Sequence, residues 1–214
     1  ERPSFMRQAQ PGLRQSLRAA AANRPFLFGA GIYLFTWVAF SILEAILLFF
    51  IKYVAGREAQ SEVIMATIFV VAIVALPLWQ WVSRRFNKRK AYIAGIAFWA
   101  VVQLVLARVS PATAYPLLLG LCVLAGVGVS AAHVLPWAII PDAIEWGELQ
   151  SGQRHEGMFY SLITLAQKIA TSLAVPAALL ILDATGYIPN SATQPAAAID
   201  GIRLVAGPAP ALLL

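Results

Sequence analysis

A single lysine lies deep inside an apolar segment of the sequence. If the segment 157–182 forms a helix across a membrane, Lys168 lies roughly 16 Å from its start, near the middle of a bilayer. An ammonium group at that depth costs roughly 2.5–3.5 kcal/mol on insertion scales, so we expect it to face the protein interior or a water-filled cavity. A charge inside a membrane indicates an ion or substrate pathway. A structural ion pair with a carboxylate on another helix is the alternative.

Hydroxyl side chains share the helix face that carries this lysine. At 100° per residue, the residues that fall on one stripe are Ser161, Thr164, Lys168, Thr171 and Ser172. The residues that lie away from this stripe include Leu162, Ala166, Ile169, Ala170 and Leu173. One polar stripe on an apolar helix is typical of a wall that lines an aqueous path.

Charged residues also gather just before this segment. The set comprises three acidic residues at intervals of three, followed across a short loop by a basic and another acidic residue: Asp142, Glu145, Glu148, Arg154 and Glu156. Like charges this close repel one another unless they are paired, and Arg154 is a ready partner. We expect an ion-pair network that acts as a gate, and a solvated loop is the alternative.

The composition is that of an all-α polytopic membrane protein. Of the 214 residues 60% are hydrophobic and 12% are charged, with a mean hydropathy of +0.73, whereas soluble domains have roughly 25% charged residues. The sequence predicts five complete spans: Phe26–Ile51, Val63–Val82, Ala91–Ala107, Tyr115–Ile140 and Gly157–Leu182. A sixth begins near Ile202 and ends at Leu214, too short to cross a bilayer, so the predicted bundle has a truncated last helix. Small residues in the fourth span, including Gly120, Gly126 and Gly128, allow close helix approach.

The basic residues predict the orientation of the spans. They cluster in the segment 1–25 and in the loop 83–90, two spans apart, and Arg154 lies on the same side. The positive-inside rule makes this side cytoplasmic, which makes the expected gate a cytoplasmic gate. The topology explains these clusters, and no aromatic residues are interleaved for base stacking, so we expect no nucleic-acid partner.

Neither an enzyme nor a metal protein is indicated. The sequence has no HExxH, GxSxG or Walker motif, and its two histidines and one cysteine cannot build an ordinary metal site. Cys122 lies in an apolar run and is expected to be a small buried hydrophobe. We therefore expect no catalytic residues, no metal and no cofactor.

The block 135–173 resembles a known family of transporters. In order along the chain it contains Pro141-Asp142, Glu145-Trp146-Gly147-Glu148, Arg154, Glu156-Gly157, Tyr160-Ser161 and Lys168. This order is similar to the C-terminal half of the glycoside–pentoside–hexuronide:cation symporters, the melibiose permease-like family of the major facilitator superfamily. The segments "NRPF", "WVSRRFNKRKAYI" and "GYIPN" are also similar, so the resemblance covers nearly the whole chain.

The resemblance implies how the chain is organised. Residues 1–25 correspond to the cytoplasmic central loop, and residues 26–214 to a C-terminal six-helix bundle, helices seven to twelve with the last incomplete. In this family the lysine of helix eleven faces the central cavity near the cation site, so Lys168 is its counterpart, with Tyr160 on the same pathway. The acidic residues that mainly form the cation site lie in the N-terminal half, which nothing in this sequence matches.

The function implied by the resemblance is cation-coupled symport by alternating access. The substrate is expected to be a sugar or glycoside, and the coupling cation is expected to be Na⁺ or H⁺. The protein is expected to be an integral membrane protein of the bacterial inner (plasma) membrane. The expected partners are the small-molecule substrate, the lipid bilayer and the missing N-terminal half. The alternatives are a lipid or amphiphile transporter of the same superfamily and a non-transporting membrane scaffold or receptor, in which Lys168 is dispensable.

Overall fold

The computed structural model describes residues 13–151 and 156–214, and the regular structure of these residues is entirely helical. In chain order the elements are α1 (Leu13–Ala22), α2 (Arg24–Phe49), the π-helical turn η1 (Phe50–Val54), the 3₁₀ turn η2 (Glu58–Gln60), α3 (Ser61–Phe86), α4 (Lys88–Leu106), α5 (Tyr115–Ser151), α6 (Glu156–Ala184), α7 (Ala196–Ala206) and α8 (Pro208–Leu213). This agrees with the predicted all-α membrane fold.

Each of the five predicted spans corresponds to one helix, although Phe26–Ile51 extends into η1 and Ala91–Ala107 ends one residue beyond α4; the sixth differs from the prediction. Among the described residues, six helical segments are long and apolar enough to cross a membrane. The sixth covers 18 residues, Ala196–Leu213, so the predicted start near Ile202 was wrong. Asp200 and Gly201 interrupt the apolar run before Ile202, but three alanines and Ile199 extend the helix back to Pro195 at its N-cap position. By length and composition this segment is a candidate span, although Gly207 interrupts it.

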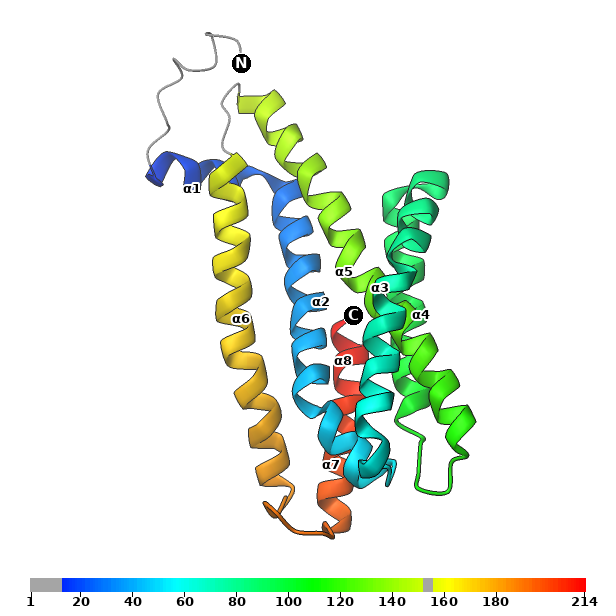
Figure 1. Ribbon diagram of the computed structural model, residues 1–214. Coiled ribbons are helices and arrows are strands. Elements are labelled where there is room, and N and C mark those ends of the chain that lie inside the picture. Colours follow the sequence, from blue (N-terminus) through cyan, green and yellow to red (C-terminus); the bar gives the residue numbers. More distant parts are fainter. Residues whose placement is uncertain (1–12, 152–155) are drawn as a thin grey trace.

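Helix α5 is central to the bundle, whereas α6 lies at one edge. Helix α5 packs against α2, α3 and α4, and α6 packs against α2 and α7. Figure 1 shows α6 at the left edge, α1 lying across the end of the bundle where α2 begins, and the C-terminus about midway along α2. One broad side of α6 therefore has no neighbour among the described helices.

Close backbone approach holds α5 against its neighbours. A Cβ atom on Gly126 would lie 2.6 Å from the carbonyl oxygen of Ile68 in α3. A Cβ atom on Gly128 would lie 2.6 Å from Cδ1 of Trp99 in α4, which is fully buried. Small residues thus let α5 touch α3 and α4 directly, as expected from the small residues of this span.

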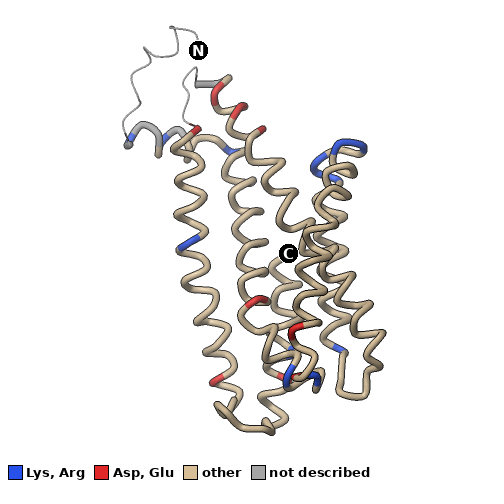
Figure 2. The backbone as a smooth tube through the Cα atoms, in the orientation of Figure 1, with Lys and Arg blue, Asp and Glu red and all other residues tan. Residues whose placement is uncertain are grey.

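The two ends of the bundle carry different sets of charged residues. In Figure 2 Lys and Arg gather on α1 and on the turn between α3 and α4, both at the end where α2 begins. At the opposite end Lys52 pairs with Glu58 at 2.6 Å, and Nη2 of Arg57 donates to the carbonyl oxygen of Thr113. The two ends therefore differ as the positive-inside rule requires.

This arrangement predicts that single cysteines at Ala59 and Lys90 react from opposite sides of the membrane. Both positions are exposed. Ala59 lies in η2, just before α3 begins, and Lys90 lies in the first turn of α4, at the opposite end of the bundle. A membrane-impermeant maleimide added to intact cells should label only position 59, and position 90 should react after permeabilisation. Cys122 is buried and should stay unlabelled, which makes the parent protein the control. Equal labelling of both positions in intact cells would contradict the topology.

Candidate functional site

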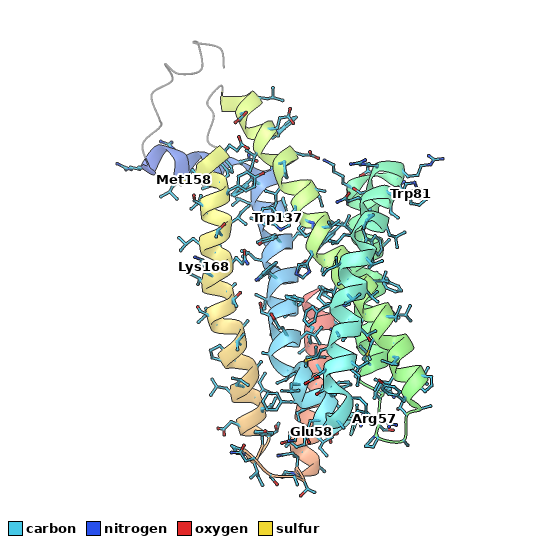
Figure 3. All side chains as sticks on the ribbon, in the orientation of Figure 1. Arg57, Glu58, Trp81, Trp137, Met158 and Lys168 are labelled. Carbon is cyan, nitrogen blue, oxygen red and sulfur yellow. The ribbon has the colours of Figure 1, made fainter. Side chains whose placement is uncertain are left out.

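Lys168 lies on the exposed side of α6. The buried residues of this helix form one seam: Phe159, Ile163, Ala174, Ala178 and Leu182. At 100° per residue Lys168 is well away from this seam, and its side chain is exposed in the described structure. Figure 3 marks its position on α6, away from both ends of the helix. It is the thirteenth residue of a 29-residue helix, so its backbone lies roughly 18 Å from the helix start.

The hydroxyl groups of the predicted stripe divide into two sets. Ser161, Thr164 and Ser172 are exposed like Lys168, and each donates to a carbonyl of its own helix at 2.8–2.9 Å. Their donors are thus satisfied, and their oxygen lone pairs remain available as acceptors beside the ammonium. Thr171 instead turns toward α2, where its Oγ1 lies 3.4 Å from Oγ of Ser41. The exposed polar surface around Lys168 therefore contains three of the four predicted hydroxyls.

Tyr160 belongs to a group of stacked rings. Its ring stacks on Trp137 of α5 with centroids 6.2 Å apart, and Trp137 meets Tyr33 of α2 edge-on at 5.3 Å. The Tyr33 hydroxyl donates to Oε1 of Gln167, the residue before Lys168, at 2.5 Å. These contacts connect α2, α5 and α6 near the start of α6. Figure 3 shows Trp137 between these helices.

The same group of rings continues along α2. Tyr33 stacks on Trp37, and both Trp37 and Phe40 contact the ring of His133 at 5.4 and 4.5 Å. Nδ1 of His133 lies 3.0 Å from the carbonyl oxygen of Val129, so a proton on Nδ1 leaves Nε2 as an acceptor. We name this group the aromatic cluster; its members are Tyr33, Trp37, Phe40, His133, Trp137 and Tyr160.

Of the aromatic cluster, the sequence predicts only Tyr160 as a site residue, and it does not predict that these rings meet. A signal was present, because Tyr33, Trp37 and Phe40 follow the i, i+4, i+7 spacing of one helix face. His133 and Trp137 are likewise four residues apart. Spacing alone did not indicate that these faces of α2 and α5 pack against each other, since aromatic stripes also occur in ordinary cores.

At the predicted gate, Asp142 has a different partner from the expected one. Both of its carboxylate oxygens accept from Nζ of Lys88, the first residue of α4, at 2.7 Å. The sequence favours Arg154 as the partner and indicates only a topological role for Lys88. Arg154 lies outside the described residues. The two side chains are 44% and 58% exposed, so the pair contributes about 0–1 kcal/mol.

The other members of the predicted gate lie at the same end of the bundle. Glu145 and Glu148 follow Asp142 on α5, and Glu156 begins α6. Glu145 is exposed, whereas Glu148 and Glu156 each make a further interaction. The wider network around Arg154 therefore stays a prediction. Within residues 13–151 and 156–214, no three acidic, histidine or cysteine side chains are grouped to hold a metal ion.

These features define a polytopic membrane protein in which the edge helix α6 carries a lysine on its exposed side. Comparison with known proteins identifies the family. The family model described as "MFS/sugar transport protein" matches residues 1–214, so the chain belongs to this family of the major facilitator type.

Named relatives of the chain are transporters. It is 36% identical to "Uncharacterized symporter sll1374" of Synechocystis sp., over 94% of this chain and 38% of the relative. It is 32% identical to "Sodium-dependent lysophosphatidylcholine symporter 1-A" of Danio rerio, over 97% of this chain and 39% of the relative. It is 30% identical to a "Putative 2,3-dihydroxypropane-1-sulfonate exporter" of Salmonella typhimurium, over 91% of this chain and 42% of the relative. The chain thus spans about two fifths of the length of these relatives.

Proposed function

We propose that the chain forms the C-terminal half of a cation-coupled secondary transporter. The observation that carries the proposal is Lys168, an exposed lysine in the middle of an apolar candidate span with exposed hydroxyl groups beside it. A lysine facing lipid at that depth is costly, so this side of α6 must meet a water-filled cavity or a polar partner. In a transporter of two halves, a midplane site between the halves supplies both.

The residues of the chain have distinct tasks in this proposal. Lys168 faces the central pathway and pairs with carboxylates or with an anionic substrate group, while Ser161 and Thr164 offer acceptors. The two halves rock around the site, and the charged end of α5 with its Lys88–Asp142 pair contributes to the cytoplasmic closed state. Na⁺ or H⁺ supplies the driving force.

The first candidate substrate is a sugar or glycoside. The description of the family and the resemblance to glycoside:cation symporters support it. The rings of the aromatic cluster suit this class, because an aromatic ring packs against the apolar face of a sugar ring. Few polar side chains accompany the rings, however, and the Gln167 carbonyl oxygen already accepts from Tyr33.

The second candidate is an anionic or zwitterionic amphiphile. The aromatic cluster offers an extended apolar wall, and Lys168 offers a cation for a phosphate or sulfonate group. Two of the relatives are named for lysophosphatidylcholine and for a sulfonate, and this favours an anionic group in the substrate.

The test is uptake by the full-length protein in proteoliposomes under an imposed Na⁺ or H⁺ gradient. We expect accumulation that one gradient drives and that collapses when an ionophore dissipates that gradient. Labelled glycosides and labelled lysophospholipid, offered separately and in competition, distinguish the two substrate classes. A non-transporting scaffold predicts no gradient-dependent accumulation of either class, and that result would contradict the proposal.

A further inference from the structure

Helix α1 leaves the bundle sideways and presents a basic side. In Figure 1 it lies across the end of α2 rather than continuing its axis. Arg14 and Arg18 are exposed and lie one helical turn apart, while Ala20 on the opposite side is buried. Leu17, which is 43% exposed, lies at the border between the two sides. The helix is therefore amphipathic, and its basic side meets no described helix.

Asn23 fixes the direction of α1. It is the only residue between α1 and α2, and it is buried. Its Oδ1 accepts from the backbone N–H of Phe26 at 3.0 Å and caps α2, while its Nδ2 donates to the carbonyl oxygen of Ala143 in α5 at 2.9 Å. A Cβ atom on Gly147 would collide with this Nδ2. The corner between α1 and α2 therefore packs on α5, and contacts with α5 help to fix the direction in which α1 leaves the bundle.

The corner holds α1 at the level of the basic turn between α3 and α4 (Figure 2). Figure 2 shows the basic residues of α1 and of the α3–α4 turn at the same end and at a similar level. Trp81, 60% exposed, lies on α3 just inside that turn (Figure 3), and its ring contacts exposed Phe86. Exposed tryptophan next to basic residues is typical of the interfacial belt of a membrane protein.

We propose that α1 is an interfacial helix that binds the headgroups of anionic phospholipids through Arg14 and Arg18. The guanidinium groups meet phosphate oxygens at the membrane surface, and the apolar border at Leu17 faces the acyl chains. Charge complementarity selects this partner, since an exposed basic side at the boundary faces the negative surface of the inner leaflet. The proposal does not depend on which substrate is transported, or on transport at all.

The test places a spin label on a single cysteine at position 17 of the full-length protein, in a background in which Cys122 and any other cysteine are replaced by alanine. The protein is reconstituted in nanodiscs of phosphatidylcholine alone, or of phosphatidylcholine and phosphatidylglycerol in equal amounts. We expect the anionic mixture to increase access of the label to lipid-soluble oxygen and to decrease access to a water-soluble nickel chelate. Raising the salt concentration should reverse the change, because salt screens exposed charges.

Charge-neutral variants locate the effect. Arg14→Gln with Arg18→Gln should lower the ratio of bound to unbound α1 in the anionic mixture by roughly 30-fold. The matched control is Arg85→Gln with Lys90→Gln, which removes the same charge from exposed positions at the same end and should leave the label unchanged. Gly147→Ala should weaken the response by disturbing the Asn23 corner, whereas Gly157→Ala, with no neighbour within 4 Å, should not.

Three outcomes would overturn the proposal. A label shielded from both reagents in both lipids would place α1 against protein. A label open to the nickel chelate in both lipids would place it in water. An unchanged response in the Arg14/Arg18 double variant would show that these two guanidinium groups do not bind the headgroups.

Discussion

Lys168→Ala is expected to abolish cation-driven accumulation while the protein still reaches the membrane. The lysine lies at mid-helix on the exposed side of α6, so its ammonium must meet a partner beyond the described helices or a substrate group. Removing one member of a buried charge pair strands the other, at roughly 3–5 kcal/mol. A free-energy loss of this size corresponds to a loss of roughly 10²–10⁴-fold in transport.

Folding should survive this substitution because the lysine itself opposes membrane insertion. Alanine removes that cost, so surface expression should equal or exceed that of the parent protein. Lys168→Arg should recover only part of the activity, since a planar guanidinium does not replace a compact ammonium. Ile169→Ala is the matched control: Ile169 is the next residue, lies at the same depth and is exposed, but it is apolar and should keep normal transport.

The measurement is gradient-driven accumulation of substrate, normalised to the amount of protein in the membrane. Normal accumulation by Lys168→Ala would show that the lysine has a structural role only, and the pathway assignment of Ser161 and Thr164 would fail with it. If expression falls together with uptake, the quantity to compare is uptake per folded molecule, measured on purified monodisperse protein.

The spans were predictable because a bilayer imposes a length and a composition on each of them. Lys168 stood out for the same reason, since one charge among apolar residues needs no structural information to be noticed. The sixth span was misplaced at its start because Asp200 and Gly201 interrupt its apolar run; Ala198, which precedes them, is nevertheless buried against neighbouring helices.

Contacts between distant residues were not predictable in this way. The partner of Asp142 is Lys88, 54 residues away, and a local pattern favours Arg154 because it is near in the sequence. The aromatic cluster requires faces of three helices to meet, and the corner at Asn23 requires Ala143, 120 residues away. Each depends on how α5 packs against α2 or α4, which hydropathy does not encode.

The second large effect is expected at Gly128, where α5 touches α4. A Cβ atom there would lie 2.6–2.7 Å from Cδ1, Cβ and Cγ of Trp99, and Trp99 is fully buried and cannot swing away. The contact involves the ring and the Cβ atom of Trp99, so relief requires the two helices to separate. Gly128→Ala should therefore destabilise the bundle by about 1–3 kcal/mol, and Gly128→Leu by more.

Gly120 provides the comparison on the same helix, because no atom lies within 4 Å of a Cβ added there. Gly120→Ala should be neutral or stabilising by roughly 0.5–1 kcal/mol, since alanine favours a helix over glycine. The two alanine variants should thus move the thermal unfolding midpoint of purified protein in opposite directions, by about 2–4 °C per kcal/mol. If Gly128→Ala and Gly120→Ala shift the midpoint equally, α4 and α5 do not approach as closely as the structure places them, and the stability of the bundle does not depend on the contact between Trp99 and Gly128.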